Sequence, residues 1–320
     1  MTHRFLLSLI ICALIPGLPT YAREHENTPH PKKEKRLKIK EKRVKTRKAA
    51  LKLLTRKKIN EADYDTALLE SIKSGELRTA TALVLAGATL NRPADQESPL
   101  HLAAQYGDAD LLRVMLEHGA DLNHKITRTQ GDLTGTGMNA LFSAVLGNNV
   151  STLEHLHQQG LDIHACDSSR PFSQTPMQKA AFAGSLECFE YLHTHGGDIG
   201  QRYGNGFSYL HAAANRGHLK LVKYILDQGV DINATNKAEI TPIMSAGMGK
   251  HADVIRYLAD RGADINAQDN YFRRTIMHHV TAMGDAELVE YLTSKGARMD
   301  IRDRDGKTAA EIWKQTQNAK

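Results

Sequence analysis

Residues 208–233 read SYLHAAANRGHLKLVKYILDQGVDIN, and this stretch determines how the rest of the chain is interpreted. The same frame restarts at Ser98, Thr175, Thr241 and Thr275 with the segments SPLHLAAQYG, TPMQKAAFAG, TPIMSAGMGK and TIMHHVTAMG. A glycine follows twelve residues after each segment, at Gly119, Gly196, Gly229, Gly262 and Gly296. Self-similarity at a fixed period predicts a stack of repeated units rather than a single globular core.

Weaker copies of the same frame extend the series in both directions. They start at Thr66 and Asn139, and a last half copy starts at Thr308. Most intervals between successive starts are 33 or 34 residues. The Thr-Pro-Leu-His-like starts and Gly-Ala-Asp-Ile-Asn-like ends at this period resemble the ankyrin repeat. The resemblance covers about residues 61 to 315. It implies an all-α ankyrin-repeat solenoid of seven to eight helix-turn-helix repeats with β-hairpin-like fingers.

The repeated residue types have local physical reasons. Ser or Thr at the start of a copy caps the first helix, and Pro99, Pro176 and Pro242 take the first helical position, where proline is tolerated. Small residues at one frame position let neighbouring helix pairs approach closely: Ala103, Ala144, Ala180, Ala213 and Ala246. Glycine or asparagine at the turn between the two helices favours the left-handed conformation: Gly75, Gly107, Asn148, Gly184, Gly217 and Gly284. Lys250 breaks this pattern, so we expect Gly249 to make that turn.

The repeats are predicted to form one domain over residues 61–320. Thr79 and Ala80 replace a large apolar pair in the first copy, so this copy is expected to be a terminal cap, and Ile312 and Trp313 suit a shortened last copy. Two connections, Lys125 to Met138 and Asp167 to Gln174, are longer than the rest. Insertions in such arrays map to loops on one face, often the binding face.

The first 22 residues have the layout of a secretory signal peptide. His3 and Arg4 precede an apolar run of about 11 residues, where a membrane-spanning helix needs roughly 20. Pro16, Gly17 and Pro19 follow, and the small residue Ala22 fits a cleavage site. We expect cleavage after Ala22 and a periplasmic or secreted protein; the alternative is an uncleaved anchor. Since eukaryotic ankyrin arrays are mostly cytosolic, an export signal favours a bacterial protein.

Residues 23–60 form a basic arm with a net charge of +12, whereas residues 61–320 carry −7. The high isoelectric point therefore belongs to the arm, and the repeats are not expected to bind nucleic acid. One interpretation of the arm is a solvated helix or disordered tail. A second is an anchor to an anionic envelope surface, where each Lys or Arg contributes about 1 kcal/mol. A third is a nucleic-acid-binding arm of an intracellular regulator, which requires that the signal peptide be misread.

The sequence predicts no catalytic, cofactor-binding or metal site. Gly135-Thr136-Gly137 lacks the context of a nucleotide loop. His155/His157 and His193/His195 are spaced by two residues, unlike the i, i+4 pairs of zinc helices. The resemblance implies that His101, His211 and His278 instead make structural hydrogen bonds to neighbouring loops. Cys188 occupies a core position, and its pairing with Cys166 is left open.

The expected function is non-catalytic binding of another protein by a monomeric scaffold. The resemblance implies that partners contact the fingers, the first helices and the concave face between them. Aromatic residues and arginine are enriched in interface hot spots. The candidate contact residues are Arg202, Tyr203, Phe207, Tyr271, Phe272, Arg273 and Arg274 in the fingers, with Tyr106, Phe182 and Arg216 on first helices. The alternative interpretation of Phe272 is a loop residue folded over the core.

The mature N-terminus distinguishes the exported forms from the intracellular regulator. We expect intact-mass measurement of the protein purified from its native host to show a chain that starts at Arg23. A mass that retains Met1 would contradict export.

Overall fold

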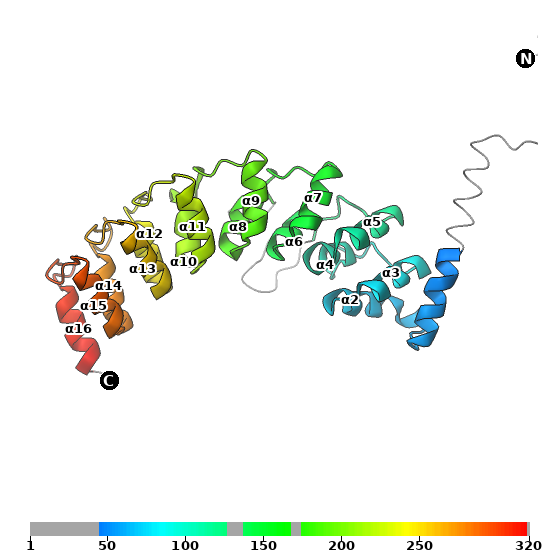
Figure 1. Ribbon diagram of the computed structural model, residues 1–320, viewed down its shortest axis with the longest axis horizontal. Coiled ribbons are helices and arrows are strands. Elements are labelled where there is room, and N and C mark those ends of the chain that lie inside the picture. Colours follow the sequence, from blue (N-terminus) through cyan, green and yellow to red (C-terminus); the bar gives the residue numbers. More distant parts are fainter. Residues whose placement is uncertain (1–44, 127–136, 168–173, 319–320) are drawn as a thin grey trace, which may run out of the picture. The chain divides into compact units, whose positions relative to one another are not determined.

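The computed structural model describes residues 45–126, 137–167 and 174–318 (Figure 1). The chain divides into a unit over Met1–Ala49 and a compact unit over Ala50–Lys320. The predicted signal peptide and most of the predicted basic arm lie outside the described residues, as do the central parts of the two long connections. In the described part of the chain, no helix is long and apolar enough to cross a membrane.

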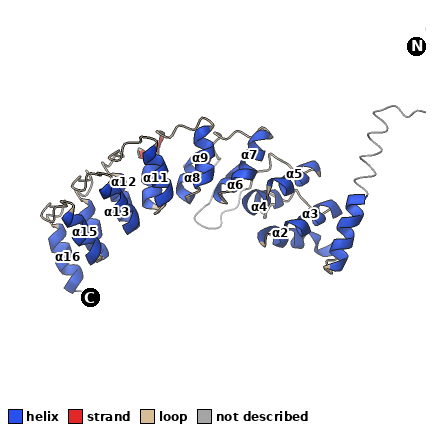
Figure 2. Cartoon of the chain, viewed as in Figure 1, coloured by secondary structure: helices blue, strands red, loops and turns tan. Residues whose placement is uncertain are grey.

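The second unit is a series of helix pairs, and Figure 2 shows how little of its described chain is strand. The pairs are α2 (Tyr64–Lys73) with α3 (Leu77–Ala86), α4 (Pro99–Tyr106) with α5 (Ala109–Glu117), α6 (Ala140–Leu146) with α7 (Val150–Gln158), α8 (Pro176–Ala183) with α9 (Leu186–Thr194), α10 (Tyr209–Asn215) with α11 (Leu219–Asp227), α12 (Pro242–Gly249) with α13 (Ala252–Asp260), and α14 (Ile276–Met283) with α15 (Ala286–Ser294). The 3-10 helix η2 (Glu61–Asp63) precedes them and α16 (Ala309–Asn318) follows. First helices pack on first helices of the adjacent pairs, and the predicted all-α solenoid is confirmed.

The connections between pairs are finger loops. The finger between α9 and α10 is a hairpin of β1 (Arg202–Tyr203) and β2 (Phe207–Ser208), antiparallel with Tyr203 opposite Phe207. Single antiparallel bridges close two other fingers, Ile126 with Met138 and Arg302 with Thr308. The predicted β-hairpin-like fingers are therefore present in the described residues.

The predicted core positions are confirmed. The five alanines of the shared frame position are 0% exposed, which allows successive first helices to pack closely. The hydroxyl groups of Thr175, Ser208 and Thr241 each accept the backbone N–H three residues later, as helix caps do. One continuous apolar cluster runs through the pairs, from Leu54 to Ala309.

Histidines tie three of the first helices, α4, α10 and α14, to the next finger. The Nε2 atom of His101 donates to the Met138 carbonyl over 3.0 Å, and His211 donates in the same way to Ile240 over 2.9 Å. His278 makes a longer contact of 3.3 Å with the Lys307 carbonyl. The hydrogen bonds that the family resemblance implied are confirmed.

Two turn predictions are wrong. Gly107 is extended rather than left-handed, with φ −87° and ψ −159°, and its carbonyl accepts the side-chain amide of Asn149. Lys250, not Gly249, takes the left-handed turn after α12, with φ 63°. Gly249 is needed for space instead, since a Cβ atom there would meet the Asn215 carbonyl oxygen. Both turns that depart from the pattern therefore contact an asparagine of a neighbouring repeat.

The first predicted copy is not the end of the stack. Thr79 and Ala80 are buried rather than capping, since residues 50–56 are helical and place Ala50 and Leu54 in the core. Lys57 also pairs with Glu76 of the first copy. The compact unit therefore begins before Glu61, because the face left by small residues in the first copy needs an apolar cover.

Truncating a central core residue should destabilise the array far more than truncating a finger residue. Leu221 is 1% exposed between helix pairs, so Leu221→Ala should lower the free energy of unfolding by about 2–5 kcal/mol. Lys237→Ala in an exposed finger should change it by no more than about 0.5 kcal/mol. Denaturant unfolding measures both, and the reverse order would contradict the repeat frame.

Stability should fall as the pH drops below 6.5. Burial lowers the pKa of His101 to about 4, although its bond to Met138 opposes the shift, and burial also lowers the pKa of His211, His278 and His279. The unfolded chain then binds protons that the folded chain does not, so stability present above pH 6.5 is lost progressively toward pH 4. At 1.4 kcal/mol per pKa unit, His101 alone accounts for about 3 kcal/mol.

A substitution isolates this contribution. Gln178 occupies the position of His101 in the fourth copy, where it is buried and completes a capping box. We expect His101→Gln to unfold with a shallower pH dependence than the native chain in denaturant titrations between pH 7.5 and 4.5. Identical pH dependence of the two proteins would exclude His101 as a source of the acid sensitivity.

Candidate protein-binding surface

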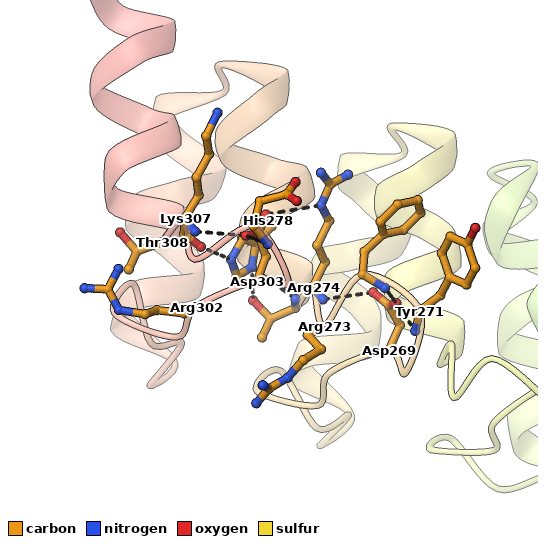
Figure 3. Close-up of polar contacts among 12 residues, drawn as sticks. Asp269, Tyr271, Arg273, Arg274, His278, Arg302, Asp303, Lys307 and Thr308 are labelled. Atoms are coloured by element: carbon orange, nitrogen blue, oxygen red, sulfur yellow. Dashed lines mark hydrogen bonds and ion pairs between the residues drawn. The ribbon is translucent and has the colours of Figure 1, made fainter.

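A buried acidic side chain shapes the finger between α13 and α14. One Asp269 carboxylate oxygen accepts the backbone N–H groups of Tyr271 and Phe272 over 2.9 and 2.6 Å. The other accepts that of Arg274 over 2.9 Å, and Asp269 itself is 6% exposed (Figure 3). Three N–H groups on one carboxylate fix the loop backbone, and the side chains between them are directed by that backbone rather than by the core.

Other fingers use the same device. Asp303 accepts the N–H groups of Asp305 and Lys307, and Asn236 accepts those of Ala238 and Ile240. These anchors were not among the sequence-predicted site residues. Their signal is a recurring Asp or Asn shortly before each Thr that caps a first helix, at 167, 236, 269 and 303.

The fixed loop presents two aromatic side chains to solvent. Tyr271 is 60% exposed and Phe272 is 46% exposed, and their rings meet edge to face with centroids 4.5 Å apart. The next finger supports this loop, because the backbone N–H of Arg304 donates to the Phe272 carbonyl over 2.7 Å and its guanidinium donates to that of Tyr271 over 3.1 Å. The alternative in which Phe272 folds over the core is not what the structure shows, and the pair is a rigid apolar projection.

The two arginines of this finger differ. Arg273 is exposed and left-handed, with φ 56°. Arg274 is half-buried: its Nε atom lies 3.6 Å from an Asp303 carboxylate oxygen, and its guanidinium carbon lies 4.9 Å from the centre of the Phe272 ring. Arg274 therefore links two fingers and supports Phe272, whereas Arg273 is free to meet a partner.

The finger of β1 and β2 is less accessible than the sequence suggested. Arg202 is exposed and donates to the carbonyls of Gly206 and Thr235. Tyr203 is half-buried, its hydroxyl donates to the Ser208 carbonyl, and burial raises the pKa of Tyr203 well above its usual range. Phe207 is half-buried with its ring 5.6 Å from that of His211.

Two of the three candidates on the first helices cluster with the finger of β1 and β2, and Tyr106 lies apart from them. Phe182 is half-buried between Arg216, whose guanidinium carbon lies 5.9 Å from its ring centre, and Tyr203, whose ring is also 5.9 Å away. Tyr106 is 51% exposed, and in the described residues no ring or cation contact joins it to this cluster. Met248 on α12 is equally exposed and was not among the sequence-predicted contact residues.

A buried ion pair closes the base of the second long connection. The Lys179 ammonium lies 3.7 Å from an Asp167 carboxylate oxygen, with both side chains almost fully buried. Asp167 and Gln174 also exchange two hydrogen bonds, each 2.9 Å long. Burial lowers the pKa of Lys179, while Asp167 opposes the shift. This arrangement holds the two ends of residues 168–173 together, and it explains why a lysine is tolerated in a core helix.

The polar residues left open by the sequence have structural roles. Cys166 is exposed and Cys188 is buried, and both are free thiols; burial raises the pKa of Cys188 to about 12. His157 and His193 each contact the hydroxyl of a tyrosine in the next repeat, Tyr191 and Tyr224. Among the described residues, no group of three or more His, Cys, Asp or Glu is placed to hold a metal ion.

Helix pairs that stack side by side and are joined by finger loops place this chain in the class of helical repeat proteins. The family description "Ankyrin repeats (3 copies)" matches residues 43–126, 141–236, 179–269 and 243–312, and "Ankyrin repeats (many copies)" matches residues 100–157. The chain therefore belongs to the ankyrin repeat family. The crystal structure of the human ASB11 ankyrin repeat domain is similar, with a TM-score of 0.56 and 23% identity over 70% of this chain and 97% of that one, which supports the fold.

The curated relatives match only part of this chain. The chain is 30% identical over 141 residues to the human transient receptor potential cation channel subfamily A member 1, covering 43% of this chain and 12% of the channel. It is 28% identical over 127 residues to palmitoyltransferase AKR1 of Lachancea kluyveri, 38% of this chain and 16% of that protein. It is 30% identical over 145 residues to ankyrin repeat protein nuc-2 of Neurospora crassa, 44% of this chain and 13% of that protein. The chain thus aligns with less than a fifth of each relative.

Proposed function

We propose that this chain is a non-catalytic module that binds another protein through its fingers and first helices. The observation that supports the proposal is the exposed pair Tyr271 and Phe272, held on a loop fixed by Asp269. An exposed aromatic pair contributes nothing to the core, yet aromatic side chains on a rigid support lose little conformational entropy when a partner covers them. Arg273 beside them offers several unpaired donors.

The activities named for the relatives are not carried over. A channel and a palmitoyltransferase align with this chain only over 12% and 16% of their own lengths. The repeat array of this chain favours recognition as its role.

The proposed setting is outside the cytoplasm of a bacterium. The argument rests on residues 1–22, whose charged start, short apolar run and small residue at Ala22 are typical of a cleaved signal peptide. The net charge of +12 over residues 23–60 further suggests contact with an anionic envelope surface once the chain is exported.

A partner isolated by pull-down with the native chain should bind the variant Tyr271→Ala/Arg273→Ala more weakly. Truncation of Tyr and Arg at an interface often costs more than about 2 kcal/mol, so the dissociation constant should rise by about thirtyfold or more. Isothermal titration calorimetry against the purified partner measures the change.

The matched control is Lys223→Ala/Arg261→Ala. It removes one exposed side chain from the outer helix α11 and one from the turn that ends α13. It should leave the affinity unchanged, and circular dichroism should show the same helix content for all three proteins. Unchanged affinity of the finger variant with an intact fold would move the site elsewhere, first to the connection from Lys125 to Met138. Lost helicity would mean that the aromatic pair stabilises the array.

A further inference from the structure

Charge is divided unevenly along the repeats. Residues 61–200 contain 18 Asp and Glu against eight Lys and Arg, a net charge of −10. Residues 201–320 contain 14 against 17, a net charge of +3. The acidic average of the repeat domain therefore hides a basic second half, separate from the basic arm at the N-terminus.

Within the second half, part of the exposed positive charge lies on the fingers, defined here as residues 201–207, 234–240, 267–274 and 301–307. Six of their exposed side chains are basic: Arg202, Lys237, Arg273, Arg302, Arg304 and Lys307. Only Glu239 and Asp305 are exposed and acidic, because Asp269 and Asp303 are buried at the finger bases. These six cations are called the finger strip below.

The cations of the finger strip are not neutralised. None of the six forms an ion pair with another described residue. On the outer side of the repeats, Arg261 pairs with Asp227 over 3.4 Å and Lys295 pairs with Asp260 over 2.7 Å, whereas Lys220 and Lys223 of α11 form no ion pair with another described residue. What distinguishes the fingers is that all six of their exposed cations are open and that they lie beside an exposed aromatic pair.

Three arginines of the finger strip are held in place by neutral partners. Arg202 donates to the Gly206 carbonyl, and Arg302 donates to the Gly306 carbonyl over 2.6 Å at the matching place of another finger. Arg304 donates to the Tyr271 carbonyl. Figure 3 shows Arg302 beside Lys307 and Thr308. A carbonyl fixes a guanidinium group without cancelling its charge, and the remaining N–H groups stay available for an anion.

We propose that the finger strip binds an acidic polypeptide segment whose apolar or aromatic side chain packs on Tyr271 and Phe272. The inference rests on the proposed protein-binding function and names the chemistry of the partner. A carboxylate-bearing segment satisfies the open guanidinium groups, and the aromatic pair at the centre of the strip requires an apolar contact. A long polyanion fits less well, since the adjoining half of the array carries −10 and repels it.

Selection from a random peptide library displayed on phage tests the proposal with the full chain. The native protein is compared with Arg273→Glu/Arg302→Glu and with the control Lys220→Glu/Lys223→Glu, whose exposed lysines lie on the outer helix α11. All three proteins carry the same basic arm, and both variants change the net charge equally. Binding to the arm, or binding that follows overall charge, is therefore the same for the two variants and does not distinguish them. Circular dichroism confirms that each is folded.

Peptides enriched on the native chain over the finger variant should be net acidic and contain an aromatic or branched apolar residue. A synthetic peptide from that set should bind the finger variant at least about tenfold more weakly and the control within about twofold, and added salt should weaken its binding. Replacing its Glu residues by Gln, or Tyr271 by Ala in the protein, should each reduce affinity.

Two results would overturn the proposal. One is a selected set that is no more acidic than the starting library, or that binds the finger variant equally well; the protein-binding function would then stand with another site. The other is tighter binding of single-stranded oligothymidylate than of the best peptide to the finger strip. That result would identify a nucleic-acid site. Failure of the proposed function itself appears separately, as the absence of any peptide or partner protein that the native chain binds.

Discussion

The structure depends on the contact between successive first helices. No helix pair in this chain has a core of its own, so each must be covered by its neighbour. The alanines at one frame position bring the helices close, and the histidine hydrogen bonds, such as that from His211 to the Ile240 carbonyl, attach each finger to the preceding repeat. The position of a finger therefore depends on the stability of the repeat before it, because the finger is held in place only when that repeat is folded.

The fingers gain their own order from buried side chains at their bases. Asp269 and Asp303 accept several backbone N–H groups each, so the side chains of Tyr271 and Arg273 are not needed to hold the loop. Arg274 and Arg304 do join neighbouring fingers, Arg274 through its ion pair with Asp303 and Arg304 through its hydrogen bond to the Tyr271 carbonyl. A loop that is rigid yet free on its outer surface suits recognition, since little conformational freedom remains to be lost on binding.

The sequence predicted what is local and repeated, and missed what depends on a neighbour. Caps such as Thr175 and the fold class follow from residue types in a frame. Gly107 and Lys250 departed from it because Asn149 and Asn215 of other repeats occupy the space beside the turns. Leu54 lies within the predicted basic arm, although its side chain is buried and covers the first copy. Of the candidate contact residues, Tyr271 and Arg273 lie exposed as expected, whereas the burial of Tyr203 and Arg274 follows from contacts that the pattern does not encode.

The placement of charge cannot be explained by stability alone. Exposed ion pairs typically contribute less than about 1 kcal/mol, so pairing on the outer helices adds little and its absence on the fingers costs little. Like charges on neighbouring fingers do repel, however, and Glu239 and Asp305 are too few to offset Arg202, Lys237, Arg273, Arg302, Arg304 and Lys307. Substituting a few of these cations with neutral residues would relieve that repulsion without touching the core. The exposed pair Tyr271 and Phe272 adds nothing to the apolar core, so the open cations and the aromatic pair together are best understood as a requirement of what the fingers bind.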